Sequence, residues 1–216
     1  MVILGKPLAL KAGGFLFGAH KEMKTALLID GGYLRAEVQT VGKRYDANFV
    51  RSFSQLCVDS EEYLFRIFYY DARPYDGRVQ LPVSGEWKQF TPSNFMMDDL
   101  AKFERFAVRH GTLGFRGWKP RNIPIANAAL SDADFKPVFE QKGVDMRIGL
   151  DIASFSDLRT VERIVLVSGD TDMVPAMKHA RKCGLEVGVI QLPEPCKDLH
   201  HTLLHHSDFV RQVSLP

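Results

Sequence analysis

Short, strongly apolar runs that alternate with helical patterns constrain the fold of this chain more than any other feature. Three of them, rich in Ile, Val, Leu, Phe and Tyr, are TALLID (25–30), YLFRIFYYDA (63–72) and RIVLVSGD (163–170), and LEVGVI (185–190) is a weaker fourth. Runs of this length are typical of strands buried on both faces of a parallel sheet. We therefore expect an α/β fold, a three-layer α/β/α sandwich of Rossmann-like type.

Apolar residues at helical spacing fill most segments between these runs. One predicted helix begins at Leu34, and four others cover Asn48–Cys57, Phe95–His110, Val144–Leu158 and Met173–Lys182. Two stretches break the alternation and are expected as loop insertions, near 73–95 and 119–142, because they contain several prolines and glycines or little periodicity. Residues 111–120 between them suit only an irregular or edge strand, since they contain three glycines and a proline.

Length and composition favour one domain. The 216 residues suit a single domain at residues 24–210, after an N-terminal extension or arm at residues 1–23. No run of 18 apolar residues occurs, so no membrane contact is expected. Three scattered cysteines favour a reducing, cytoplasmic location. With a net charge of only +2, any contact with nucleic acid must come from a local basic patch.

Aspartates stand where the predicted strands end. Asp30 ends the first run, and Asp170 and Asp172 end the third. Parallel strands share one carboxyl edge, where ligands bind in open α/β sheets, and Asp145 opens the helix that precedes the third run. Two carboxylates about 4 Å apart repel by roughly 4 kcal/mol at an effective dielectric constant near 20, so such a cluster either protonates in part or binds a cation. Oxygen ligands favour Mg²⁺ or Mn²⁺.

An ordinary structural role also explains each aspartate. Asp170 and Asp172 precede a helix, where aspartate is a favoured N-cap. Asp30 before Gly31-Gly32 suits an Asx-turn, and Asp145 is an ordinary helix opener. The residues alone leave cap and ligand as open alternatives.

The segments LLIDGGYL, KGVDMRIGLDI and VLVSGDTDMVPAMKHARKCGLEVGVI resemble the NYN/LabA-like family of PIN-like nucleases. The resemblance spans most of residues 24–192, and FYYDARPYDG after the second run also resembles the family. It implies a PIN-like parallel sheet with a cluster of acidic metal ligands. Several members of the family are ribonucleases, so the implied reaction is metal-dependent hydrolysis of phosphodiester bonds, with single-stranded RNA as the expected substrate.

The resemblance assigns the catalytic and metal-ligand roles to four carboxylates: Asp30, Asp145, Asp170 and Asp172. Ser168, Thr171 and Asp151 are expected beside these ligands; Asp151 lies six positions after Asp145, about 240° round a helix, and does not share its face. The first motif departs from the family in one place, because Tyr33 stands where an asparagine is common. Tyr33 is therefore a weak candidate for substrate contact, and the departure lowers the expectation of activity more than that of the fold.

Basic and aromatic residues in the two expected insertions and in the segment 111–120 between them are candidates for binding the RNA backbone and bases. They are Arg73, Arg78, Arg116, Trp118, Lys119 and Lys142. The alternative is a solvated edge strand with the tryptophan packed in a core.

Other functions remain to be weighed. A haloacid-dehalogenase-type phosphatase needs an Asp at the position of Gly32, which disfavours it. A non-catalytic RNA-binding or regulatory module would keep the same fold. The histidines at 200, 201, 205 and 206 are expected at the surface or at an oligomer interface, because Thr202 stands where a zinc helix of the H-E-x-x-H type carries glutamate. Self-association of the chain is left open.

Overall fold

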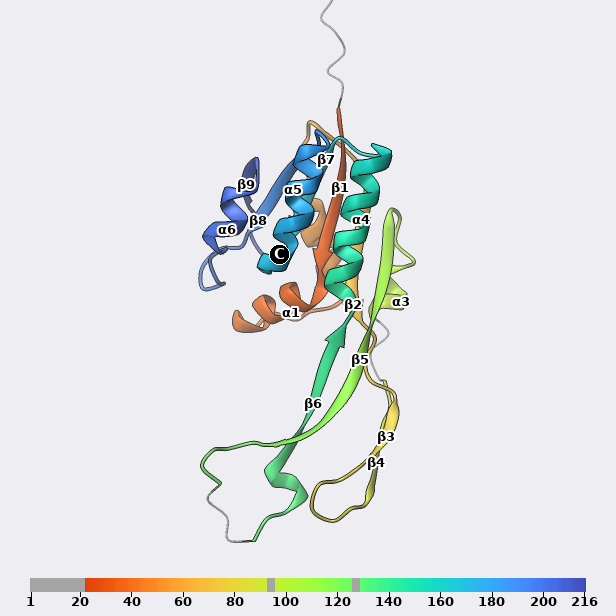
Figure 1. The fold of residues 1–216 in the computed structure, drawn as a ribbon, viewed down its shortest axis with the longest axis vertical. Coiled ribbons are helices and arrows are strands. Elements are labelled where there is room, and N and C mark those ends of the chain that lie inside the picture. The colour runs from red at the N-terminus through yellow and green to blue at the C-terminus, as the bar shows by residue number, and fades with distance from the viewer. Residues whose placement is uncertain (1–21, 93–95, 126–128) are drawn as a thin grey trace, which may run out of the picture.

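A seven-stranded, mostly parallel sheet forms the centre of the molecule (Figure 1). The structure is a computed structural model, and it describes residues 22–92, 96–125 and 129–216. The sheet has the order β6-β5-β2-β1-β7-β8-β9, in which only β5 and β6 pair antiparallel. Its strands are β1 (Met23–Asp30), β2 (Glu62–Ala72), β5 (Phe106–Pro120), β6 (Phe135–Lys142), β7 (Arg163–Val167), β8 (Glu186–Gln191) and β9 (Phe209–Gln212). The expected α/β fold is confirmed, whereas most of the expected N-terminal arm lies outside the described residues.

Helices cover both faces of this sheet. They are α1 (Gly31–Thr40), α2 (Ala47–Leu56), α3 (Met96–Leu100), α4 (Val144–Leu158), α5 (Val174–Lys182) and α6 (His201–His205). Apolar residues of α4, α5 and α6 form one core with one face of the sheet, and those of α1, α2 and α3 form a second core with the other face. Within the described part of the chain, none of the helices has the length and apolarity that a bilayer-spanning segment needs.

The prediction of a helix at Phe95–His110 is wrong. Residue 95 lies outside the described residues, and the helix that follows, α3, ends at Leu100. Arg105 has a positive φ of 64°, which a right-handed helix does not contain. From Phe106 the chain pairs in parallel with β2, beginning opposite Ile67. The apolar spacing was ambiguous because Phe103 and Phe106 pack into the core from a turn and a strand.

The two expected loop insertions are also corrected, because they contain paired strands. Gly77–Gln80 (β3) and Trp87–Phe90 (β4) form an antiparallel hairpin. The second half of β5, Thr112–Pro120, pairs with β6, and a register shift lies between Phe115 and Gly117. We call β3, β4, this half of β5, and β6 the arm, which is distinct from the N-terminal extension expected at residues 1–23. Figure 1 shows the arm extending beyond the end of the sheet at which the parallel strands finish.

A cluster of aromatic rings holds the arm together. Tyr75, Phe90, Phe115, Trp118 and Phe139 contact one another with ring centroids 5.4–6.4 Å apart. The indole Nε1 of Trp118 also donates a hydrogen bond of 2.8 Å to the carbonyl of Gln80, which joins β5 to the hairpin. Trp118 is therefore a packing residue of the arm.

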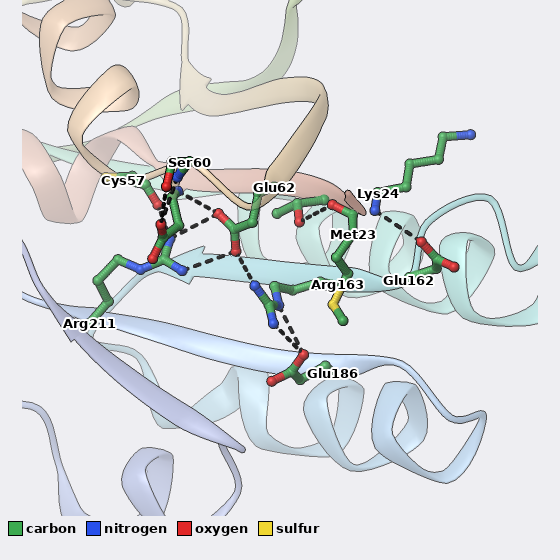
Figure 2. A network of polar contacts seen from close by, with 11 residues as sticks. Met23, Lys24, Cys57, Ser60, Glu62, Glu162, Arg163, Glu186 and Arg211 are labelled. Atoms are coloured by element: carbon green, nitrogen blue, oxygen red, sulfur yellow. Dashed lines mark hydrogen bonds and ion pairs between the residues drawn. The ribbon is translucent and has the colours of Figure 1, made fainter. Parts of the chain in front are cut away.

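Buried ion pairs tie the strands together at the opposite, amino end of the sheet (Figure 2). The Glu62 side chain is fully buried and accepts hydrogen bonds from Arg163 at 2.5 Å and from Arg211 at 3.0 and 3.1 Å. Arg163 continues to Glu186 on β8 at 2.6 Å. Burial works to raise the pKa of Glu62, but the bonds from Arg211, the Asp59 amide and Arg163 outweigh it and hold that pKa below its ordinary value. The network thus links β2, β7, β8 and β9.

Replacing Glu62 by glutamine should destabilise the fold. Two mostly buried guanidinium groups would lose a charged partner, although Arg163 would keep Glu186, and breaking comparable buried pairs costs about 3–5 kcal/mol. The free energy of unfolding, measured by urea denaturation at pH 7, should fall by that amount, whereas Glu61→Gln at the exposed neighbouring position should change it by less than about 0.5 kcal/mol. The wild-type advantage should vanish as the pH falls through the lowered pKa of Glu62. Equal stability of the two variants would show that the pairs are unimportant.

Candidate functional site

The carboxyl ends of the central strands carry the acidic residues. Asp30 ends β1 and lies opposite Tyr70 of β2, so Asp71 follows at the adjacent strand end. On the other side β1 pairs with β7, with Ile29 opposite Val167. Ser168 comes directly after β7 and leads to Asp170. The parallel arrangement therefore brings three strand ends to one edge.

Asp30 is held in one orientation at this edge. Its residue is 7% exposed, and Oδ1 accepts a hydrogen bond of 3.1 Å from the Tyr33 amide, as the N-cap of α1. Oδ2 accepts a longer bond of 3.4 Å from the Ser168 hydroxyl. Burial, followed by the charges of Asp145 and Asp71, raises the pKa of Asp30 to about 6, although the amides of Tyr33 and Gly32 oppose the shift. The carboxylate thus caps helix α1, but its surroundings compensate little of its negative charge.

Asp170 and Asp172 follow β7 in a short turn. Oδ1 of Asp170 accepts a hydrogen bond of 2.9 Å from the Asp172 amide, and the Asp170 amide donates to the Ser168 hydroxyl at 3.1 Å. Asp170 therefore caps the 3₁₀ turn Thr171–Met173 (η2) that leads into α5. Ser168 connects the ends of β1 and β7, because the same hydroxyl contacts both aspartates. Thr171 is exposed in this turn.

Asp145 lies in the first turn of α4, within electrostatic reach of Asp170 and Asp172. Burial, then the charges of Asp170 and Asp172, raise its pKa above the ordinary value. The charge of Asp145 in turn raises the pKa of Asp30, so Asp145 lies within electrostatic reach of both the end of β1 and the turn after β7. The cap and the ligand alternatives are not exclusive, because the caps use Oδ1 of Asp30 and of Asp170, and the second oxygen of each carboxylate takes no part in them.

Asp151 is placed apart from this group. Its Oδ2 accepts a hydrogen bond of 2.8 Å from the Tyr70 hydroxyl and one of 3.1 Å from Arg109. These contacts anchor α4 to β2 and β5. Asp151 therefore positions the helix that carries Asp145.

Sequence reasoning missed Asp71, a fifth carboxylate at the edge. It is 2% exposed and forms an ion pair with Arg35 of α1. It also accepts a hydrogen bond of 3.1 Å from Tyr69, whose hydroxyl lies 2.9 Å from that of Tyr45. A signal was available, because Asp71 ends the second apolar run much as Asp30 ends the first.

Gln141 at the end of β6 was missed as well. A Cβ added at Gly32 would lie 3.3 Å from Asp30 Oδ1 and 3.5 Å from the Gln141 side chain. The Gln141 amide therefore reaches the turn beside Asp30. At Gly31 an added Cβ would lie 2.3 Å from the Tyr69 hydroxyl, so this turn needs glycine for close packing. No local pattern in the sequence could place Gln141, because β6 itself was not predicted.

Tyr33 points into the protein. Its ring packs against Gly169, where an added Cβ would lie 2.7 Å from it. Its hydroxyl is buried and has no hydrogen-bond partner among the described residues, and burial raises the pKa of Tyr33. Tyr33 is therefore a packing residue, and its inward position does not favour the substrate contact expected from the sequence.

Most of the predicted cationic residues lie on the arm or beside it. Arg116 and Lys142 flank Glu140, the latter at 3.9 Å, and Lys119 is exposed. Arg78 lies over the ring of Trp87 at 5.2 Å. Arg73 is at the base of the arm, 3.4 Å from Asp98 and from the ring nitrogens of His110.

The edge carboxylates have the chemistry of a hard-cation site. Mg²⁺ is commonly held by one or two carboxylates and keeps several waters. The described residues fit that mode better than a compact cage. A compact group, in which three ligand atoms of His, Cys, Asp or Glu all lie within 4.8 Å of one another, is found elsewhere within residues 22–92, 96–125 and 129–216. It consists of Asp157, His179 and Cys183.

Comparison with known proteins agrees with this architecture. The model of the NYN domain family matches residues 24–202. A crystal structure of a protein of unknown function from Vibrio parahaemolyticus has a similar fold, with a TM-score of 0.51 at 15% identity, covering 91% of this chain and 96% of that chain. No curated protein matches the chain.

Asp30→Asn should stabilise the metal-free protein at neutral pH. Its raised pKa means that wild-type Asp30 contributes stability below the unfolded pKa of 3.8 and loses it as the pH rises through about 6. Asparagine keeps the cap but has no charge, so the variant should gain about 3 kcal/mol over wild type between pH 4 and pH 7.5. Urea unfolding at the two pH values measures this. Asp46→Asn, at the N-cap of α2 beside Arg44, should show no such gain; a gain equal to that of Asp30→Asn would contradict the assignment.

Tyr33→Phe should stabilise the protein by about 1 kcal/mol, because it removes a buried hydroxyl that lacks a partner. Thermal unfolding measures the gain. Tyr45→Phe is the matched control and should destabilise, since its hydroxyl contacts Tyr69 and lies 3.4 Å from the Gly31 carbonyl. A loss of stability in Tyr33→Phe would mean that its hydroxyl has an unseen partner.

Proposed function

The chain belongs to the NYN domain family, and on that premise we propose that it is a metal-dependent ribonuclease that hydrolyses phosphodiester bonds in single-stranded RNA. The observation that carries the proposal is that Asp30 and the Asp170–Asp172 turn follow neighbouring parallel strands and are joined through the Ser168 hydroxyl, beside Asp145, whose charge raises the pKa of Asp30. A group of like charges on a sheet edge is stabilised when a cation binds to it. LabA-like proteins remain the subfamily that the motifs resemble.

In this proposal Asp30, Asp145, Asp170 and Asp172 surround Mg²⁺ or Mn²⁺, one or two of them as direct ligands and the others through bound water. When bound, the ion polarises a phosphoryl oxygen and lowers the pKa of a coordinated water. Ser168 and the Tyr33 amide keep the Asp30 carboxylate oriented. Asp145 is exposed at the helix start and has a raised pKa, so its carboxylate is suited to accept the proton of an attacking water. No side-chain nucleophile is required.

The arm supplies the surface for the RNA strand. Its hairpin presents Trp87, which is 55% exposed and stacked with Arg78. Lys88 lies 5.3 Å from the centroid of the Phe90 ring and 5.9 Å from that of Trp118. The exposed ring of Trp87 and the cations beside it suit single-stranded RNA, because a base stacks on the ring while the cations attract phosphates. The strand would run from this hairpin to the carboxylates, passing Gln141.

A non-catalytic RNA-binding module is the second candidate. The inward position of Tyr33 favours it, because the family's usual asparagine at this place has no equivalent here. The two functions differ in one measurement, the appearance of cleaved product.

Asp170→Asn should abolish cleavage of labelled single-stranded RNA in the presence of Mn²⁺, with a loss of about 100-fold or more, because a charged metal ligand becomes a neutral amide. The same substitution should remove the rise in melting temperature that Mn²⁺ causes in the wild type. Asp46→Asn is the control and should behave as wild type in both assays. Equal cleavage by wild type and Asp170→Asn would identify a contaminant, and RNA binding without cleavage by either would favour the binding module.

Trp87→Ala should weaken RNA binding by about 5- to 100-fold, the loss expected for one stacked base. Fluorescence anisotropy with a short labelled RNA measures it. Trp87→Phe should retain most of the affinity. Val83→Ala, at an exposed position of the same hairpin, should leave the affinity unchanged. If Trp87→Ala binds as tightly as wild type, the hairpin is not the RNA surface.

A further inference from the structure

A second group of metal-type ligands lies between α4 and α5, far from the carboxyl edge. Asp157 is in the last turn of α4, and His179 and Cys183 are one helical turn apart at the end of α5. Figure 1 shows the two helices side by side on one face of the sheet, with these ends away from the arm. Asp157 comes 12 residues after Asp145 in the same helix, which separates them by about 18 Å along its axis.

The three side chains converge on one point. His179 Nε2 lies 2.8 Å from Asp157 Oδ1 and 3.7 Å from Cys183 Sγ, and Sγ lies 4.0 Å from Oδ1. In a tetrahedral zinc site with ordinary bond lengths, the corresponding separations are about 3.3, 3.6 and 3.5 Å. Each observed separation lies within about half an ångström of these values, which small changes in side-chain torsion angles accommodate.

We propose that Asp157, His179 and Cys183 bind a zinc ion, with water as the fourth ligand. One carboxylate, one imidazole and one thiolate are ligands that zinc accepts and that Mg²⁺ does not prefer. Cys183 binds as the thiolate, so its proton is released to the solvent as the ion enters. The site would clamp α4 to α5.

Helix dipoles favour a cation at this place. The carboxyl ends of α4 and α5 both carry partial negative charge, and they meet here. Asp157 adds a full negative charge to the last turn of α4, which has no basic residue of its own. Arg181 and Lys182 in the last turn of α5 supply part of the compensation, and a divalent ion between the two helix ends would supply the rest.

The geometry argues against a Cys–His–Asp catalytic triad. In such a triad one ring nitrogen contacts the carboxylate and the other contacts the nucleophile. Here the same atom, His179 Nε2, lies nearest to both partners. One nitrogen that faces an oxygen and a sulfur suits coordination of a shared ion.

Cobalt substitution under reducing, metal-free conditions tests the proposal with the full chain. Addition of Co²⁺ should give one bound ion per chain that absorbs by thiolate-to-metal charge transfer. The band should be absent in Cys183→Ser, whose fold is checked by circular dichroism. Zn²⁺ should displace the cobalt and raise the melting temperature of the wild type more than that of Cys183→Ser. Asp157→Asn should weaken Zn²⁺ affinity at least tenfold.

Two controls separate this site from others. His205→Ala removes a surface histidine whose ring lies 5.6 Å from that of His201 and should leave the band unchanged. Asp170→Asn, at the carboxyl edge, should also keep it, so failure here is distinct from failure of the nuclease proposal. The zinc site is refuted if no charge-transfer band forms, if the band persists in Cys183→Ser, or if it disappears in His205→Ala.

Discussion

The common direction of the central strands governs where charge accumulates in this protein. All parallel strands begin at one edge and finish at the other, so buried carboxylates near their ends gather in two places. At the amino edge Glu62 meets Arg163 and Arg211, and its pKa is lowered. At the carboxyl edge Asp30 meets further carboxylates, and its pKa is raised. One edge is neutralised internally, whereas the other is where we propose that a cation binds from outside.

Much of the core was predictable from the sequence because its signals are local. The runs at 25–30 and 63–72 became β1 and β2, and the helix at Val144–Leu158 matches α4. The arm was not predictable in this way. Its strands depend on ring contacts between segments distant in the chain, such as Tyr75 with Phe139, and its glycines and prolines weaken any local strand pattern.

The candidate site shows the same division. Asp30, Asp145 and the Asp170–Asp172 turn were inferred because chain order alone places strand ends on one edge. Asp71 and Gln141 were missed. The environment of Asp71 depends on Arg35, on another element, and the position of Gln141 depends on the pairing of β6 with β5. Such contacts appear only once the strands are registered against one another.

The continuity of β5 has a mechanical consequence. Its first residues, Phe106–Gly111, pair with β2 inside the core, and the same strand then continues as the spine of the arm. The nine residues Thr112–Pro120 extend about 30 Å at the rise of a β-strand. No flexible joint separates them from the core strand, although the irregularity near Gly117 bends the pairing. The arm therefore sets a constant distance between its far end and the carboxylates. In the proposed function, an RNA strand bound at that far end would reach the carboxylates after a constant number of nucleotides.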